Sequence, residues 1–112
     1  MNAKYWQRGE TLDYTPDAAV KNGAVVSLGT RIGIAGSDIA GSDIAAGEQG
    51  QIHVVGVFEM AKDAAEITLG AAVYYNEAED QITATADGNV PAGYAVQAAG
   101  AASATVLVKL LG

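Results

Sequence analysis

The chain has 112 residues, half of them hydrophobic but only 6% aromatic, and six basic against thirteen acidic side chains give a net charge of −7. This length suits one domain with a modest core, and the acidic balance argues against binding to nucleic-acid phosphates or to an anionic membrane surface. The absence of cysteine excludes disulfides and thiolate chemistry, and no apolar run approaches the ~20 residues of a transmembrane helix.

Residues 1–10 form the one locally basic stretch and hold the only tryptophan. The residues that give the stretch this character are Lys4, Tyr5, Trp6 and Arg8. One interpretation is an edge strand whose aromatic side chains cover the core. The other is an arm that binds a partner, because Trp, Tyr and Arg dominate interface anchors. Residues 11–112 are predicted to form a single β domain.

Short strands are predicted over residues 11–15, 24–28 and 30–35, with turn signals such as Asn22-Gly23 between them. The five residues from Gly36 are then repeated at once as residues 41–45. Asp38 and Asp43 in this duplication suggest calcium, but the several spaced oxygen ligands and closing Glu of a calcium loop are missing. We therefore expect an exposed connection without a metal.

Residues 51–60 are predicted to form the central strand of the protein. Four apolar side chains share one parity, and the other parity is apolar in its middle, which is typical of a strand covered on both sides. Gly56 interrupts the pattern, where we expect a bulge, a bend or a close backbone approach. The first parity consists of Ile52, Val54, Phe58 and Met60, and the second of His53, Val55, Val57 and Glu59.

The remainder of the chain predicts one short helix and four strands. Residues 61–66 have helical propensity over one to two turns. Residues 71–76 and 81–85 are expected to form a hairpin across an acidic turn, with Val73 and Tyr75 on one face. Residues 94–97 and 103–111 close the chain as strands. The predicted fold class is all-β, a small single-domain β-barrel or β-sandwich of short strands with at most one short helix.

No reaction centre can be recognised in the sequence. His53 is the only histidine, and catalysis or zinc binding needs further partners around it. Neither a phosphate-binding glycine loop nor a nucleophile motif is present. We therefore expect no enzyme activity, no cofactor and no metal.

The order of motifs resembles the DUF2190 family of phage and prophage capsid cement (head decoration) proteins. Gly56-Val-Phe-Glu59 and Leu69-Gly-Ala-Ala-Val-Tyr-Tyr75 carry the resemblance best, and it spans nearly the whole chain. The other matching segments are Tyr5, Gln7-Arg-Gly9, Asn22-Gly-Ala-Val-Val26, Arg31-Ile-Gly-Ile-Ala35, Ala46-Gly-Glu48, Gly93-Tyr-Ala-Val96 and Thr105-Val-Leu-Val-Lys-Leu110. The duplication of residues 36–45 is outside the pattern.

The resemblance implies a β domain that is made in the bacterial cytoplasm, binds the outer surface of an expanded phage head and stabilises it. It implies the major capsid protein as partner, a homotrimer, and neither nucleic acid nor membrane as ligand. On this basis the sequence predicts capsid contacts at Lys4, Tyr5, Trp6 and Arg8, and a subunit interface at His53, Val55 and Val57. The alternative is a small β-barrel module that binds a peptide or a glycan, with Tyr74, Tyr75 and Tyr94 as candidate aromatic platforms.

Overall fold

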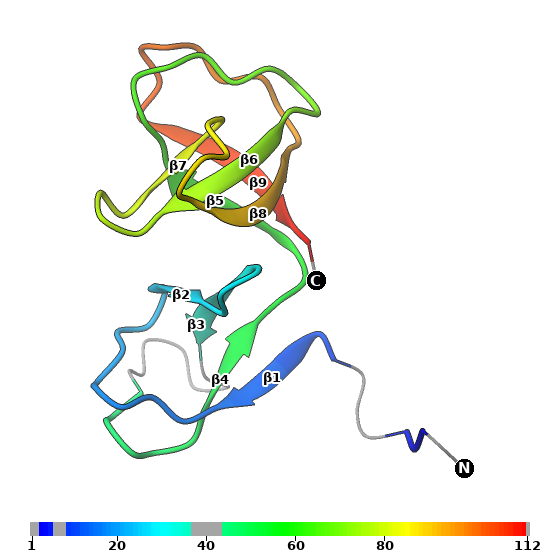
Figure 1. Cartoon of the computed structure of the whole chain (residues 1–112), viewed down its shortest axis with the longest axis vertical. Helices are drawn as coiled ribbons and strands as arrows, with labels where there is room; N and C mark the ends of the chain where they lie inside the picture. Colours follow the sequence, from blue (N-terminus) through cyan, green and yellow to red (C-terminus); the bar gives the residue numbers. More distant parts are fainter. Residues whose placement is uncertain (1–2, 6–8, 37–43, 112) are drawn as a thin grey trace.

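The computed structural model describes residues 3–5, 9–36 and 44–111, which fold into two antiparallel sheets (Figure 1). The four-stranded sheet has the order β1-β4-β3-β2 and contains β1 (Thr11–Tyr14), β2 (Val25–Ser27), β3 (Ile32–Gly36) and β4 (Gly50–His53). The five-stranded sheet has the order β5-β9-β8-β6-β7 and contains β5 (Val57–Ala61), β6 (Ala72–Asn76), β7 (Gln81–Thr83), β8 (Val90–Ala95) and β9 (Thr105–Leu110). The predicted all-β class is confirmed. No helix among these residues is long and apolar enough to cross a membrane.

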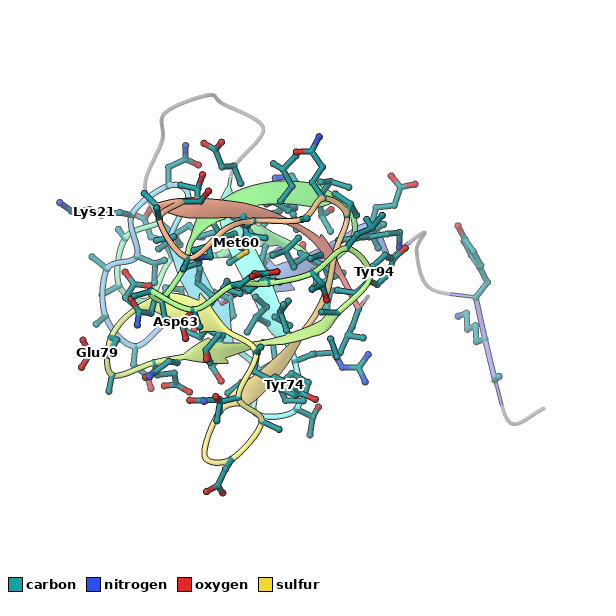
Figure 2. The ribbon with its side chains drawn as sticks, turned by 90° about the horizontal axis from the view of Figure 1, so that it is seen from above. Lys21, Met60, Asp63, Tyr74, Glu79 and Tyr94 are labelled. Carbon is teal, nitrogen blue, oxygen red and sulfur yellow. The ribbon has the colours of Figure 1, made fainter. Side chains whose placement is uncertain are left out.

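The five-stranded sheet curls until its two edge strands approach each other. A single parallel bridge joins Lys62, just after β5, to Ile82 in β7, and the Asp63 N–H donates to the Ile82 carbonyl at 3.0 Å. The sheet therefore forms a small barrel, closed at this bridge and open along the rest of the seam between β5 and β7. We call this part of the molecule the barrel. In Figure 2 the strands surround the side chain of Met60, which is buried.

The main core fills the barrel and extends into the four-stranded sheet. Val73, Ile82, Val108 and Leu110 are at most 1% exposed inside the barrel. Their burial follows from alternation along β6, β7 and β9, which places every second side chain on the inner face. The last strand confirms the predicted face for its valines and Leu110, whereas Ala104 just before it is exposed.

Strand β3 joins the two sheets, and all five of its residues are buried. Ile32 and Ile34 belong to the barrel core, while Ala35 packs into a second, smaller core between the strands and loops of the four-stranded sheet. Gly33 lets the side chain of Ile52 in the neighbouring strand β4 lie close against the backbone of β3, because a Cβ at this position would be 2.9 Å from Cδ1 of Ile52. The doubly covered strand of this fold is β3.

The predicted central strand over residues 51–60 is wrong. The segment divides into β4 and β5, which belong to different sheets, and the chain crosses between the sheets at Gly56 with φ of +128°. The expected bend at Gly56 is thus confirmed. Val55 and Val57, on the side expected to be covered, are 45% and 51% exposed. The apolar residues of both parities predicted one strand covered on both sides, but the segment forms two strands, β4 and β5, and each is covered on one side only.

The helical propensity of residues 61–66 does not lead to a helix, which agrees with the expectation of at most one short helix. Ala61 ends β5, Lys62 forms the bridge to Ile82, and the following residues form bends that lead to a second bridge at Ile67. A one- to two-turn helix is too short to be stable by its propensity alone. The backbone of Lys62 instead donates to the Ala104 carbonyl at 3.1 Å, which continues the pairing of β5 with β9.

Candidate functional site

The N-terminal arm, defined here by residues 3–5, lies apart from both sheets in Figure 2. These residues have no regular secondary structure, Lys4 is exposed, and Tyr5 is 78% exposed. Tyr5 therefore does not cover the core, and its ring is available to a partner. The other two predicted contact residues, Trp6 and Arg8, lie outside the described residues.

One exposed row of side chains crosses the outside of the barrel. The strand register places Val57 opposite Lys109, Lys109 opposite Tyr94, and Tyr94 opposite Ala72. Directly paired residues point to the same side of a sheet, and all four side chains are exposed. The Lys109 ammonium lies 5.9 Å from the centre of the Tyr94 ring. We call this row the barrel face.

Two further exposed apolar side chains extend the barrel face toward the crossing between the sheets. The Leu110 N–H donates to the Gly56 carbonyl at 3.0 Å, so the pairing of β9 with the chain before β5 continues past Val57. Val55 and Leu111 each lie one residue beyond this hydrogen bond along their own segment, and they are 45% and 53% exposed. Together with Val57 they form an apolar patch of the kind that marks interaction sites.

The structure separates the three residues of the predicted subunit interface. Val55 and Val57 lie in the exposed patch just described, but His53 belongs to β4 of the four-stranded sheet and is half-buried. Its ring centre is 6.1 Å from that of Phe58 in β5, across the junction of the two sheets. These residues have the same parity in the sequence, but the bend at Gly56 places His53 on a different surface from Val55 and Val57.

A groove of about 580 Å³ lies at this junction. One wall comes from the ends of β2, β3 and β4, and the other from β5, β6, β7 and the turn before β7. Its volume is within the range of about 300–1,000 Å³ in which pockets bury most of a bound ligand. The apolar lining residues include Val25, Ile34, Phe58, Met60 and Ile82, and the ionisable ones are His53, Glu59, Tyr75 and Asp80. The groove could not be predicted from the sequence, because residues from both sheets must come together to form it.

Tyr75 lies at the groove with its ring buried and its hydroxyl donating to Oδ1 of Asp80 at 2.5 Å. Burial raises the pKa of Tyr75 far above its ordinary value, and the nearby negative charge of Asp80 adds to this effect. Tyr75 and Val73 occupy the predicted common face of β6. Tyr75 is therefore wrong as a glycan platform, while Tyr74 is half-buried and Tyr94 is 44% exposed.

Lys62 is a buried charged residue that the sequence did not single out. Its ammonium donates to the carbonyls of Asp63, Gly100 and Ser103 at 2.8, 3.0 and 3.2 Å. These bonds tie the segment after β5 to the loop before β9. Within the described residues no three or more His, Cys, Asp or Glu side chains gather as they would around a metal ion. Asp38 and Asp43, weighed as calcium ligands, lie outside those residues.

These features define a small all-β protein with an extended arm, an exposed apolar patch and a groove between its two sheets. A family model described as phage cement protein matches residues 6–110. The chain therefore belongs to the phage cement protein family and is a component of a phage capsid. It matches no curated protein and no solved structure.

Proposed function

We propose that this protein binds the outer surface of an expanded phage head and stabilises it as a homotrimer attached to the major capsid protein. The observation that carries the proposal is the family match over residues 6–110. A protein with this role needs no catalytic group and no cofactor. We propose further that it is made in the bacterial cytoplasm and acts on the assembled virion.

The surfaces of the protein support a role in binding other subunits. The exposed patch of Val55, Val57 and Leu111 is suited to contact between subunits, and the arm presents an exposed aromatic ring. A net charge of −7 favours solubility before assembly. A trimer that contacts several capsid subunits at once also gains avidity without needing strong individual contacts.

The direct test is to add purified protein to expanded heads that lack it. We expect it to sediment with the heads, to saturate at a fixed number of copies per head, and to raise the temperature at which the heads rupture. Heads that stay undecorated at saturating protein would refute the proposal. Unexpanded proheads provide the control, because the proposed surface exists only after expansion.

The apolar patch offers a matched pair of variants for the same assay. Val57→Glu places a charge in the proposed subunit contact, and Leu69→Glu places the same charge at a residue that is 68% exposed on the barrel and outside the patch. We expect Val57→Glu to reduce head binding about tenfold or more and Leu69→Glu to leave it unchanged, with both proteins folded by circular dichroism. Equal binding by the two variants would remove the patch from the interface.

A further inference from the structure

The groove between the sheets lies along the open seam of the barrel. Its lining includes four successive residues of β5, from Phe58 to Ala61, and Gln81 and Ile82 of β7. These strands are the two edges of the five-stranded sheet. Within the described residues no strand pairs with the outer side of β5 before the bridge at Lys62.

The hydrogen-bond pattern shows which groups of β5 face this seam. Gly56 and Lys62 both bond toward β9, through the Gly56 carbonyl to Leu110 and through the Lys62 N–H to Ala104. Hydrogen-bonded and non-bonded positions alternate along an antiparallel pair. The backbone groups of Val57 and Glu59 therefore point away from β9, and an unpaired edge of this kind is a template for an added strand.

The chemistry of the groove selects the strand that it would accept. Val25, Phe58 and Ala61, which are all partly or fully exposed, supply an apolar surface at the groove, and Glu59 and Asp80 supply two carboxylates. Its described lining residues include no lysine or arginine. The groove therefore suits an extended segment that carries an aromatic or aliphatic side chain next to a basic one.

The N-terminal arm of this same protein has that chemistry. Lys4 and Tyr5 are adjacent and exposed, and two of the six basic residues of the chain lie in its first eight positions. The arm leads into β1, which is the edge of the four-stranded sheet opposite to β2, whereas β2 borders the groove. An arm that starts from the far edge of the sheet is placed to reach the groove of another copy.

We propose that the N-terminal arm of one copy binds in the groove of a neighbouring copy and adds a strand to the free edge of its β5. In this arrangement the ring of Tyr5 packs on Phe58, and the ammonium of Lys4 faces Glu59 and Asp80. Such a contact is head-to-tail, so three copies joined by a three-fold rotation close into a ring. The inference rests on the proposed trimer of the decorating protein and adds to it a second contact between subunits, besides the apolar patch.

The absence of cysteine allows a direct cross-linking test, in solution and on heads. The double variant Ala3→Cys with Ala61→Cys places one thiol on the arm and one at the groove, and it leaves Lys4, Tyr5 and Glu59 in place. Under mild oxidation we expect disulfide-linked dimers and trimers on a non-reducing gel. The matched control, Ala3→Cys with Leu69→Cys, keeps the arm thiol and moves the second thiol to an exposed barrel residue outside the groove. It should stay monomeric.

The result on heads separates this inference from the proposed function. Heads that are decorated without linked copies of the Ala61→Cys variant would overturn arm exchange while the decoration role stands. A cross-link from Tyr5 to the capsid protein, formed by a reagent that does not join thiols, would also overturn arm exchange while the decoration role stands. It would support the capsid contact predicted from the sequence. Linked trimers on protein that does not bind heads would instead support arm exchange and refute decoration.

A second measurement uses Trp6, which is the only tryptophan and directly follows the arm in the sequence, so its emission responds to the binding of the arm. We expect its emission to shift to shorter wavelength with rising protein concentration as the arm enters a groove. Glu59→Lys should move the midpoint of this shift at least about tenfold higher, because the like charge of Lys4 then meets it. Glu66→Lys makes the same charge change at an exposed residue outside the groove and should leave the midpoint in place. Identical midpoints for the two variants would overturn the proposal.

Discussion

The barrel and the four-stranded sheet contain similar numbers of strands but bury very different cores. Among the residues that the structure describes, the barrel core contains thirteen buried residues, whereas the smaller core of the four-stranded sheet contains five. Two of the thirteen, Ile32 and Ile34, come from β3 of the other sheet. Hydrophobic stabilisation grows with buried apolar area, so most of the folding free energy comes from the barrel. The four-stranded sheet gains stability by packing one face of β3 onto it.

Because of this difference in core size, the surfaces proposed to bind partners lie at or beside the less stable part of the molecule, the four-stranded sheet. The groove lies at the junction where the smaller sheet packs on the barrel, and the arm extends from the edge of the smaller sheet. Regions with few buried contacts open most readily. A partner that fills the groove would therefore stabilise the four-stranded sheet more than the barrel.

The largest expected effect tests whether the barrel tolerates any separation of its strands. In Gly93→Ala the new Cβ would meet the Lys109 carbonyl oxygen of the neighbouring strand β9 at 1.8 Å, and the contact is with backbone that cannot rotate away. We expect a loss of more than about 4 kcal/mol, which is exceptional for one substitution, measured by urea denaturation followed by circular dichroism. Gly29→Ala, where nothing lies within 4 Å of the Cβ, should cost only about 1–2 kcal/mol through its positive φ. Similar losses for both would contradict the close approach.

A pair of matched core substitutions measures the difference between the two cores. Ile82 in the barrel is 0% exposed, and Ile52 in the four-stranded sheet is 1% exposed. We expect Ile82→Ala to cost about 4 kcal/mol and Ile52→Ala about 2 kcal/mol, because a small core relaxes more readily around the deleted methyl groups. Urea denaturation gives both values, and native-state hydrogen exchange shows which strands open. Equal costs would mean that the two sheets form one cooperative core.

The elements that can be predicted well from the sequence are strands that have one face toward the core of their own sheet and the other face toward solvent. The hairpin of β6 and β7 and the buried face of β9 follow directly from alternation, because each strand has one inner and one outer face. Residues 51–60 could not be predicted in this way. Ile52 and Met60 are both buried but in different cores, and only the three-dimensional path of the chain at Gly56 shows this.

The candidate site was only partly predictable for the same reason. The exposed aromatic residue of the arm and the apolar Val55 and Val57 are visible as composition in the sequence. The groove requires Phe58 and Tyr75 of the barrel to lie beside the ends of β2 and β3, and no local pattern encodes that juxtaposition. Lys62 was also missed, because a lysine bound by three carbonyls looks like any surface lysine in a sequence.

Lys62 provides a smaller test, directed at how the barrel is closed. Lys62→Met keeps the length of the side chain but leaves the carbonyls of Asp63, Gly100 and Ser103 without their donor. We expect a loss of about 2 kcal/mol, measured by thermal unfolding with circular dichroism. Lys21→Met removes an exposed lysine next to the four-stranded sheet (Figure 2) and should change stability by less than about 0.5 kcal/mol. Equal small effects would show that the bonds of Lys62 add nothing to barrel closure.

The smallest expected effect concerns Tyr75, where the barrel meets the groove, and it depends on pH. Because burial and the charge of Asp80 raise the pKa of Tyr75 in the folded protein, folding favours its neutral form. The contribution is fully present below the unfolded value of about 10 and is lost as the pH rises above it. Tyr75→Phe should therefore cost about 1 kcal/mol at neutral pH through the lost hydrogen bond.

The same substitution should reduce the fall in stability above pH about 10, because the variant has no phenol to ionise at this site. Urea denaturation at a series of pH values from 7 to 11 gives the comparison. Asp80→Asn is the informative companion, since it removes the charge but keeps an oxygen that accepts the Tyr75 hydroxyl, and Asn tolerates the φ of 52° at this position. Asp80→Asn should keep the part of the stability loss at alkaline pH that is caused by the burial of Tyr75. Parallel pH profiles for the unsubstituted protein and Tyr75→Phe would contradict the raised pKa and would place the alkaline sensitivity elsewhere in the molecule.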